Sequence, residues 1–165
     1  MKYFTPERYK RLQATGMQDM DAADADWEIA VTEYERHLET IRSDLPESVR
    51  HLLDDFSLHD AEVFFMGRQA GNFVLALRLE TPPRDFLVLT YSLLEPPNIG
   101  PTGLPRQYQS SKVQWLFDEI DLVRNGELAY TQSILLSNGW QVQLSFREVQ
   151  AVAVQALLPE PVASS

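Results

Sequence analysis

The sequence predicts an α+β protein in which an N-terminal layer of about three helices packs on a six-stranded antiparallel meander sheet. Apolar residues recur at helical spacing through residues 1–56, whereas residues 57–158 are rich in β-branched and aromatic runs of strand length. Asn-Gly pairs separate the last three of these runs, and such turns join antiparallel neighbours. We therefore expect a single domain over residues 1–158, with a helical part (1–56), a sheet part (57–158) and a flexible tail (159–165).

The first helix begins at Thr5 and Pro6. A threonine hydroxyl can cap free backbone N–H groups, and the first helical turn accommodates proline because its missing N–H has no partner there. A second helix should begin between Asp19 and Asp24 and continue to about Arg42, since carboxylates favour the positive end of the helix dipole. Its apolar stripe, which we expect to pack against the sheet, is Trp27, Ala30, Val31, Tyr34, Leu38 and Ile41.

A third, shorter helix follows. Asp44 and Glu47 have the spacing of a capping box ahead of Val49, Leu52 and Leu53. Six strands then fit residues 58–69, 73–81, 85–94, 113–124, 127–137 and 140–156. The stretch 95–112 contains four prolines and two glycines, so we expect no regular element there and interpret it as a lid, a binding loop or a disordered segment.

The two Asn-Gly pairs, 125–126 and 138–139, predict two-residue type I′ turns. These turns would place Glu119 opposite Gln132, and Asp121 opposite Tyr130, which would lie beside Arg147. Glu119, Asp121, Tyr130 and Arg147 are therefore candidate binding residues on one face. The other face, predicted to be the core, holds Leu116, Ile120, Leu122, Ala129, Leu135, Val142, Leu144 and Phe146. Either helices cover the apolar part of the first face, such as Phe117, or an aromatic patch is exposed there.

Several segments resemble an uncharacterised bacterial family, one of the domains of unknown function. They are the opening Met-Lys-Tyr-Phe-Thr-Pro-Glu (1–7), Ser-Leu-His-Asp-Ala-Glu-Val (57–63), Val-Gln-Trp-Leu-Phe-Asp-Glu-Ile (113–120) and Ser-Ile-Leu-Leu-Ser-Asn-Gly-Trp (133–140). The resemblance covers nearly the whole chain. It implies a bacterial, single-domain protein and transfers no site residue.

Composition excludes several classes of function. Fourteen Lys and Arg against twenty-four Asp and Glu leave a formal charge of -10, which repels a phosphate backbone, so we expect no nucleic-acid partner. The absence of cysteine excludes disulfides, thiolate metal sites and cysteine nucleophiles. The first residues lack an apolar signal core and no apolar run is long enough to span a bilayer. We expect a cytoplasmic protein without a membrane partner.

The remaining candidates for chemistry are His59, Asp60 and Glu62. Successive strand residues point to opposite faces, so His59 cannot join the two acids around one ion without a bulge. Asp60 and Glu62 could form a hard-cation site with Glu119 and Asp121 if their strands were neighbours. We favour solvated or ion-paired acids, with His59 as a structural hydrogen-bonding residue at the junction of helices and sheet. We expect no metal and no cofactor.

Motifs for serine hydrolases, zinc proteases, phosphate loops and dinucleotide binding are absent from the sequence, so we assign no catalytic residue. The favoured function is non-catalytic binding of a protein, regulatory or immunity-like, with a basic partner. The alternative is a small-ligand binder or hydrolytic enzyme that uses the acidic strand face, with or without a divalent cation. A deep pocket with shifted carboxylates would favour that alternative, and a flat acidic or aromatic surface would favour a protein partner.

Overall fold

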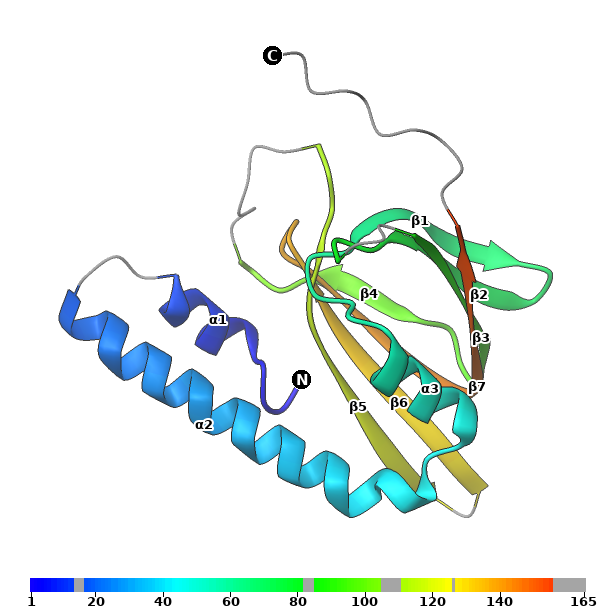
Figure 1. The fold of residues 1–165 in the computed structure, drawn as a ribbon, viewed down its shortest axis with the longest axis horizontal. Coiled ribbons are helices and arrows are strands. Elements are labelled where there is room, and N and C mark those ends of the chain that lie inside the picture. The colour runs from blue at the N-terminus through cyan, green and yellow to red at the C-terminus, as the bar shows by residue number, and fades with distance from the viewer. Residues whose placement is uncertain (14–16, 82–84, 105–110, 126, 156–165) are drawn as a thin grey trace.

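The computed structural model describes residues 1–13, 17–81, 85–104, 111–125 and 127–155. The predicted tail, 159–165, and Gly126 of the first Asn-Gly pair lie outside these ranges. The described elements form an α+β fold (Figure 1), and their bounds are α1 (Pro6–Leu12), α2 (Met17–Ile41), a 3-10 turn (Arg42–Asp44), α3 (Glu47–Asp55), β1 (Glu62–Gln69), β2 (Asn72–Arg78), β3 (Phe86–Leu93), β4 (Asn98–Pro101), β5 (Trp115–Asn125), β6 (Glu127–Leu136) and β7 (Trp140–Val154).

The sheet is antiparallel but is not a six-stranded meander. Its order is β1-β2-β3-β7-β6-β5, and β4 also pairs with β7. The meander prediction is wrong because β7, 15 residues long, pairs through its first half with β6 and β4 and through its second half with β3. Hairpin signals predict only neighbours in sequence, whereas the β3–β7 pairing joins strands that are far apart along the chain.

The extra strand, β4, lies in the proline-rich stretch that we expected to be irregular. Asn98 pairs with Gln143 and Pro101 with Trp140. A proline is compatible with a strand where its missing N–H is not needed by the ladder, as at the end of a short edge strand. Downstream, Thr102 donates from its backbone N and its hydroxyl to Gly139 O, at 2.9 and 2.7 Å. The described part of this stretch is therefore anchored to the sheet.

The chain segments at the starts of the two edge strands, β1 and β5, are joined by hydrogen bonds. Asp60 N donates to Trp115 O at 2.8 Å, Trp115 N to Ala61 O at 2.9 Å, and Val63 N to Val113 O at 2.7 Å. The sheet consequently curls towards closure and has an inner and an outer face. The inner face, which α3 covers, holds the main core, whose largest fully buried side chains are Trp115, Tyr91, Phe146, Leu52, Leu75, Leu77, Leu87, Leu89, Ile120, Ile134 and Leu144.

Helix α2 begins at Met17, two residues ahead of the predicted range of Asp19 to Asp24, and of the two helix caps predicted from the sequence one is present. Thr5 Oγ1 accepts from Arg8 N at 3.3 Å, so the predicted cap of α1 is present. The capping box predicted for α3 is wrong, because Asp44 lies in the 3-10 turn and the helix begins after Pro46, which makes no side-chain cap. Pro46 is extended, with ψ 159°, and its fixed φ sets the direction in which α3 starts.

Both predicted hairpin registers are wrong by one residue. The β6–β7 loop has three residues, 137–139, with Gly139 N donating to Leu136 O at 3.0 Å and only Gly139 at positive φ, +82°. Asn138 keeps negative φ, and its Oδ1 accepts from Trp140 N at 3.1 Å. This is a type I turn followed by a glycine bulge rather than a type I′ turn. In the β5–β6 hairpin Asn125 pairs with Glu127.

The shift moves side chains between faces. Glu119 pairs with Ser133 and Asp121 with Thr131, on the outer face, whereas Tyr130 pairs with Phe146 on the inner face. Of the core residues predicted for one face, Leu116 and Leu135 lie instead under α1, packed with Tyr9. The predicted burial of strand β7 is present, and its buried residues on this stretch are Val142, Leu144 and Phe146.

Helices α1 and α2 lie on the outer face beside β5, and β1, β2 and β3 lie at the opposite end of the sheet (Figure 1). In the predicted stripe of α2, Ala30 and Tyr34 are buried, and Trp27, Val31 and Leu38 are partly buried. Much of the stripe packs on Tyr3, Phe4 and Phe117, so the N-terminal segment lies between α2 and the sheet. No helix within the described ranges is long and apolar enough to cross a membrane.

Candidate binding surface

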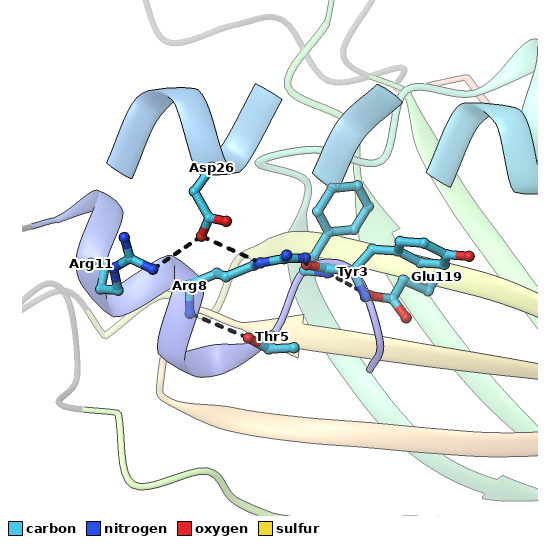
Figure 2. Close-up of polar contacts among 7 residues, drawn as sticks. Tyr3, Thr5, Arg8, Arg11, Asp26 and Glu119 are labelled. Atoms are coloured by element: carbon cyan, nitrogen blue, oxygen red, sulfur yellow. Dashed lines mark hydrogen bonds and ion pairs between the residues drawn. The ribbon is translucent and has the colours of Figure 1, made fainter. Parts of the chain in front are cut away.

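Glu119, a predicted binding residue, holds the N-terminal segment in place. Its carboxylate accepts the backbone N–H groups of Lys2, Tyr3 and Phe4 at 2.6, 2.7 and 2.6 Å, and the residue is 8% exposed. Figure 2 shows the Glu119 side chain directed at the backbone of Tyr3. Three charge-assisted hydrogen bonds use most of the acceptor capacity of one carboxylate. Glu119 therefore holds the N-terminal segment against β5. Its three hydrogen bonds to Lys2, Tyr3 and Phe4 form the Glu119 clasp.

The helices beside this clasp are joined by further ionic contacts. Asp26 of α2 accepts from Arg8 Nε at 3.4 Å and Arg11 Nη1 at 3.2 Å, both on α1 (Figure 2). Asp121, two residues beyond Glu119, contacts His37 Nε2 at 2.9 Å. These contacts fasten α1 and α2 to each other and to β5, so the acids of this region already have protein partners.

The other two residues of the predicted polar face lie elsewhere. Tyr130 is 6% exposed on the inner face, with its ring centroid 5.9 Å from that of Phe146, and burial raises its pKa. Arg147 is exposed on β7. The structure thus separates Tyr130 from Glu119 and Asp121 by the thickness of the sheet, because a one-residue register shift exchanges the faces.

His59, Asp60 and Glu62 do not converge on one point, although His59 Nε2 lies 3.5 Å from Asp60 Oδ2. His59 Nδ1 donates to Leu116 O at 2.5 Å, and its ring lies 4.9 Å from that of Phe117. Asp60 has φ +63°, and Glu62 pairs with Lys112 Nζ at 3.1 Å. Among the described residues, no group of three or more His, Asp or Glu side chains is arranged to hold a metal ion.

A buried polar network, missed from the sequence, lies on the inner face. Trp115 Nε1 donates to Asp118 Oδ1 at 3.0 Å, Gln132 Nε2 to Asp118 Oδ2 at 2.8 Å, and Tyr91 OH to Gln132 Oε1 at 2.7 Å. Burial raises the pKa of Asp118, although the two hydrogen bonds to its carboxylate oppose that shift. Each of these side chains is hydrogen-bonded to another, so the network fixes the positions of strands β3, β5 and β6 within the core.

The hollows of the surface do not coincide with these acids. Open grooves of about 560, 340 and 240 Å³ indent the described surface, and none of the three is lined by Asp118, Glu119 or Asp121. The carboxylate with the raised pKa belongs to the core network. Among the described residues, these three grooves therefore do not bring the predicted acids together.

An exposed apolar surface lies on the outer face of β1, β2, β3 and the end of β7. Its central row, in register across four strands, is Phe65, Ala76, Val88 and Val152. Phe64 lies at a register shift of β1 and contacts Phe86, with ring centroids 5.5 Å apart. The residues of this outer apolar face are Phe64, Phe65, Val74, Ala76, Phe86, Val88, Val152 and Val154.

The outer apolar face is open to solvent at its largest side chains. Phe64, Phe65, Val152 and Val154 are 51%, 49%, 56% and 49% exposed. The sequence of β3 already indicated this surface. It reads Phe-Leu-Val-Leu and lacks the alternation of apolar and polar residues that is typical of a strand with one face in solvent. Such a run indicates a strand that is apolar on both faces, and here only the inner face is covered.

No protein-family model matches this chain, and a search of curated proteins finds no significant match. The resemblance of four segments to a bacterial family of unknown function therefore stays a prediction, and the geometry alone supports a function.

Proposed function

We propose that this protein is a non-catalytic binding module, regulatory or immunity-like, whose outer apolar face contacts a basic protein partner. The observation that carries the proposal is the half-exposure of two phenylalanines on β1 and two valines on β7, at the two sides of the four-stranded outer apolar face. Monomeric proteins seldom expose a large continuous apolar surface without using it for binding. Aromatic side chains also supply a large share of the binding energy in protein interfaces.

The shape of this surface supports a protein rather than a small molecule. Its residues lie on four neighbouring strands in a continuous register, and none of the three open grooves is lined by Phe64, Phe65 or Val152. Small-molecule sites are concave and enclose most of their ligand. A patch of apolar side chains spread over four strands fits the core of a protein interface, which a polar rim surrounds.

The charge of the chain supports a basic partner. The formal charge of -10 creates a field that attracts cations over long range. On α2, exposed carboxylates follow one another at spacings of 3, 4, 7 and 4 residues along a single side of the helix, and they are Asp21, Asp24, Glu28, Glu35 and Glu39. These charges would raise the association rate of a basic protein, and the outer apolar face would slow its dissociation.

The test uses the full chain as bait in an extract of its native cell, followed by identification and purification of any protein retained. Binding of that protein is then measured for wild type, for Phe65→Ser/Val152→Thr and for the control Leu128→Ser. Leu128 is 48% exposed but lies outside the outer apolar face. We expect the double variant to weaken binding at least about tenfold, the scale of one or two hot-spot contacts, and Leu128→Ser to leave it unchanged.

A second measurement tests the electrostatic part of the proposal. The triple variant Glu28→Gln/Glu35→Gln/Glu39→Gln should slow association of the same partner, and added salt should remove the difference. A partner that binds the double apolar variant as tightly as wild type would overturn the proposed surface. Retention of a small molecule in place of a protein would support the ligand-binding or enzymatic alternative.

A further inference from the structure

The last strand leads the chain directly off the outer apolar face. Val152 and Val154 of β7 belong to that face, and Gln155 follows as an exposed residue. The next residues, 156–160, read Ala-Leu-Leu-Pro-Glu. Two leucines and a proline thus follow within a few residues of an apolar surface that no described element covers.

The distances allow these residues to reach the surface. Phe86 pairs directly with Val154, at the roughly 4.8 Å separation of neighbouring strands, and Phe64 lies against Phe86. An extended chain advances about 3.3 Å per residue, so residues 155–158 span roughly 13 Å. A turn after Gln155 would therefore leave enough chain to place Leu157 and Leu158 on both rings.

The chemistry of the surface suits this segment. Leucine and proline side chains pack well on exposed aromatic rings, and proline-containing segments are extended before they bind, which lowers the entropic cost of docking. The same face contains an unsatisfied donor: Arg78 Nε is buried and has no hydrogen-bond partner among the described residues. Arg78 pairs with Phe86 across the β2–β3 ladder. Glu160, the only acidic side chain in residues 156–165, is an acceptor of the required charge.

We propose that residues 157–160 dock on the outer apolar face of their own chain, with Leu157 and Leu158 on Phe64 and Phe86 and Glu160 at Arg78. The segment then competes with the partner for the same surface. This regulatory meaning rests on the proposed function, whereas the docking itself does not. A segment tethered beside its site acts at a high effective concentration, so weak contacts suffice to hold it.

The test is a paramagnetic relaxation measurement on the full chain. Wild type contains no cysteine, so Ser164→Cys carries a nitroxide label at one position. We expect the amide signals of Phe64, Phe65 and Phe86 to lose most of their intensity. The label on Glu28→Cys, an exposed position on α2 at the opposite end of the sheet (Figure 1), should leave those signals unchanged.

A tail variant controls for nonspecific contact. Leu157→Ser/Leu158→Ser, in the presence of the Ser164 label, should restore the amide signals, and Ala163→Ser should not. Unchanged signals in the labelled wild type, or equal broadening in the leucine variant, would overturn the proposal. Broadening that appears when labelled chains are mixed with separate isotope-enriched chains would show a second copy as the acceptor and would equally overturn docking within one chain.

Binding of the partner gives a separate readout. If the segment occupies the face about nine tenths of the time, freeing the face should raise the apparent affinity about tenfold. Leu157→Ser/Leu158→Ser should then bind the partner more tightly than wild type. If this variant restores the amide signals but binds the partner no more tightly than wild type, the docking of the segment is supported and its competition with the partner is overturned. Failure to find any partner would affect only the proposed function.

Discussion

Two ends of the same outer sheet face differ in what covers them. Beside β5, the N-terminal segment, α1 and α2 surround Phe117, whose ring lies 4.6 Å from that of Trp27 and 5.6 Å from that of Phe4. At the other end, Phe64 and Phe65 of β1 are about half exposed, and no described helix packs on them. Both ends carry aromatic side chains at strand positions, so residue type does not distinguish them.

The comparison shows how the fold uses its polar groups. At the covered end, Glu119 and Asp121 are bound to the N-terminal backbone and to His37. At the bare end, Arg78 Nε lacks a partner among the described residues. Buried polar groups are expensive when unpaired. At the covered end, the carboxylates of Glu119 and Asp121 therefore have protein partners. At the bare end, apolar side chains are exposed and Arg78 Nε has no hydrogen-bond acceptor among the described residues.

The largest expected effect contrasts an aromatic residue from each end. Trp27→Ala should lower the free energy of unfolding by about 3 kcal/mol, because it removes the ring that packs on Phe4, Tyr9 and Phe117. Phe65→Ala should cost about 1 kcal/mol, since half of its surface is already in water. Urea unfolding of the two variants measures both. Equal losses would show that the bare end is as well packed as the covered end.

The second prediction compares two acids on one strand. Glu119→Gln should lower the free energy of unfolding by about 2 kcal/mol, because an amide offers one acceptor oxygen to three N–H donors. Asp121→Asn makes the same change of charge two residues away and should cost less than about 1 kcal/mol, since its side chain is half exposed. A similar cost for both would contradict the clasp. Amide exchange at Tyr3 and Phe4 should rise only in Glu119→Gln.

The third prediction compares a turn from each end. Gly139 and Gly71 both have positive φ, +82° and +86°. A Cβ on Gly139 would lie 2.5 Å from Leu104 O, whereas a Cβ on Gly71 would meet nothing within 4 Å. Gly71→Ala should cost about 1 kcal/mol from backbone strain, and Gly139→Ala about 2 kcal/mol because the clash adds to the same strain. Thermal melts of both variants test the difference, and an equal loss would mean that Leu104 moves away freely.

The smallest expected effect is a pH dependence of the free energy of unfolding that Asp118, on the inner face, should cause. Burial raises the pKa of Asp118 above 3.8, so in the pH range between 3.8 and the raised value the native state binds more protons than the unfolded chain. The free energy of unfolding of wild type should therefore rise, relative to Asp118→Asn, as the pH falls through that range. Urea titrations of both proteins at pH 7 and pH 4 measure the change. A difference that does not depend on pH would contradict the raised pKa.

Local patterns were reliable for elements and unreliable for pairing. The α1 cap at Thr5, the long α2 and the sheet after residue 57 were predictable because caps, periodicity and turn pairs act over a few residues. The turn at Asn138 was misjudged, since Asn-Gly suits both a type I′ turn and a type I turn with a glycine bulge. In the β5–β6 hairpin, where Asn125 pairs with Glu127, a shift of one residue also placed Tyr130 on the opposite face from Glu119, so the predicted polar face is not formed.

The α+β class, the acidic charge and the approximate ends of most helices and strands were predictable from the sequence, because each depends on composition or on neighbours along the chain. Three features follow from long-range packing: β3 pairs with β7, Glu119 binds the N-terminal backbone, and Phe64 and Phe65 of β1 are exposed. These outcomes depend on contacts between residues that are far apart along the chain, 116 positions in the case of Tyr3 and Glu119. Whether a carboxylate or a phenylalanine meets water or protein is set by what packs over it, and spacing along one strand does not contain that information.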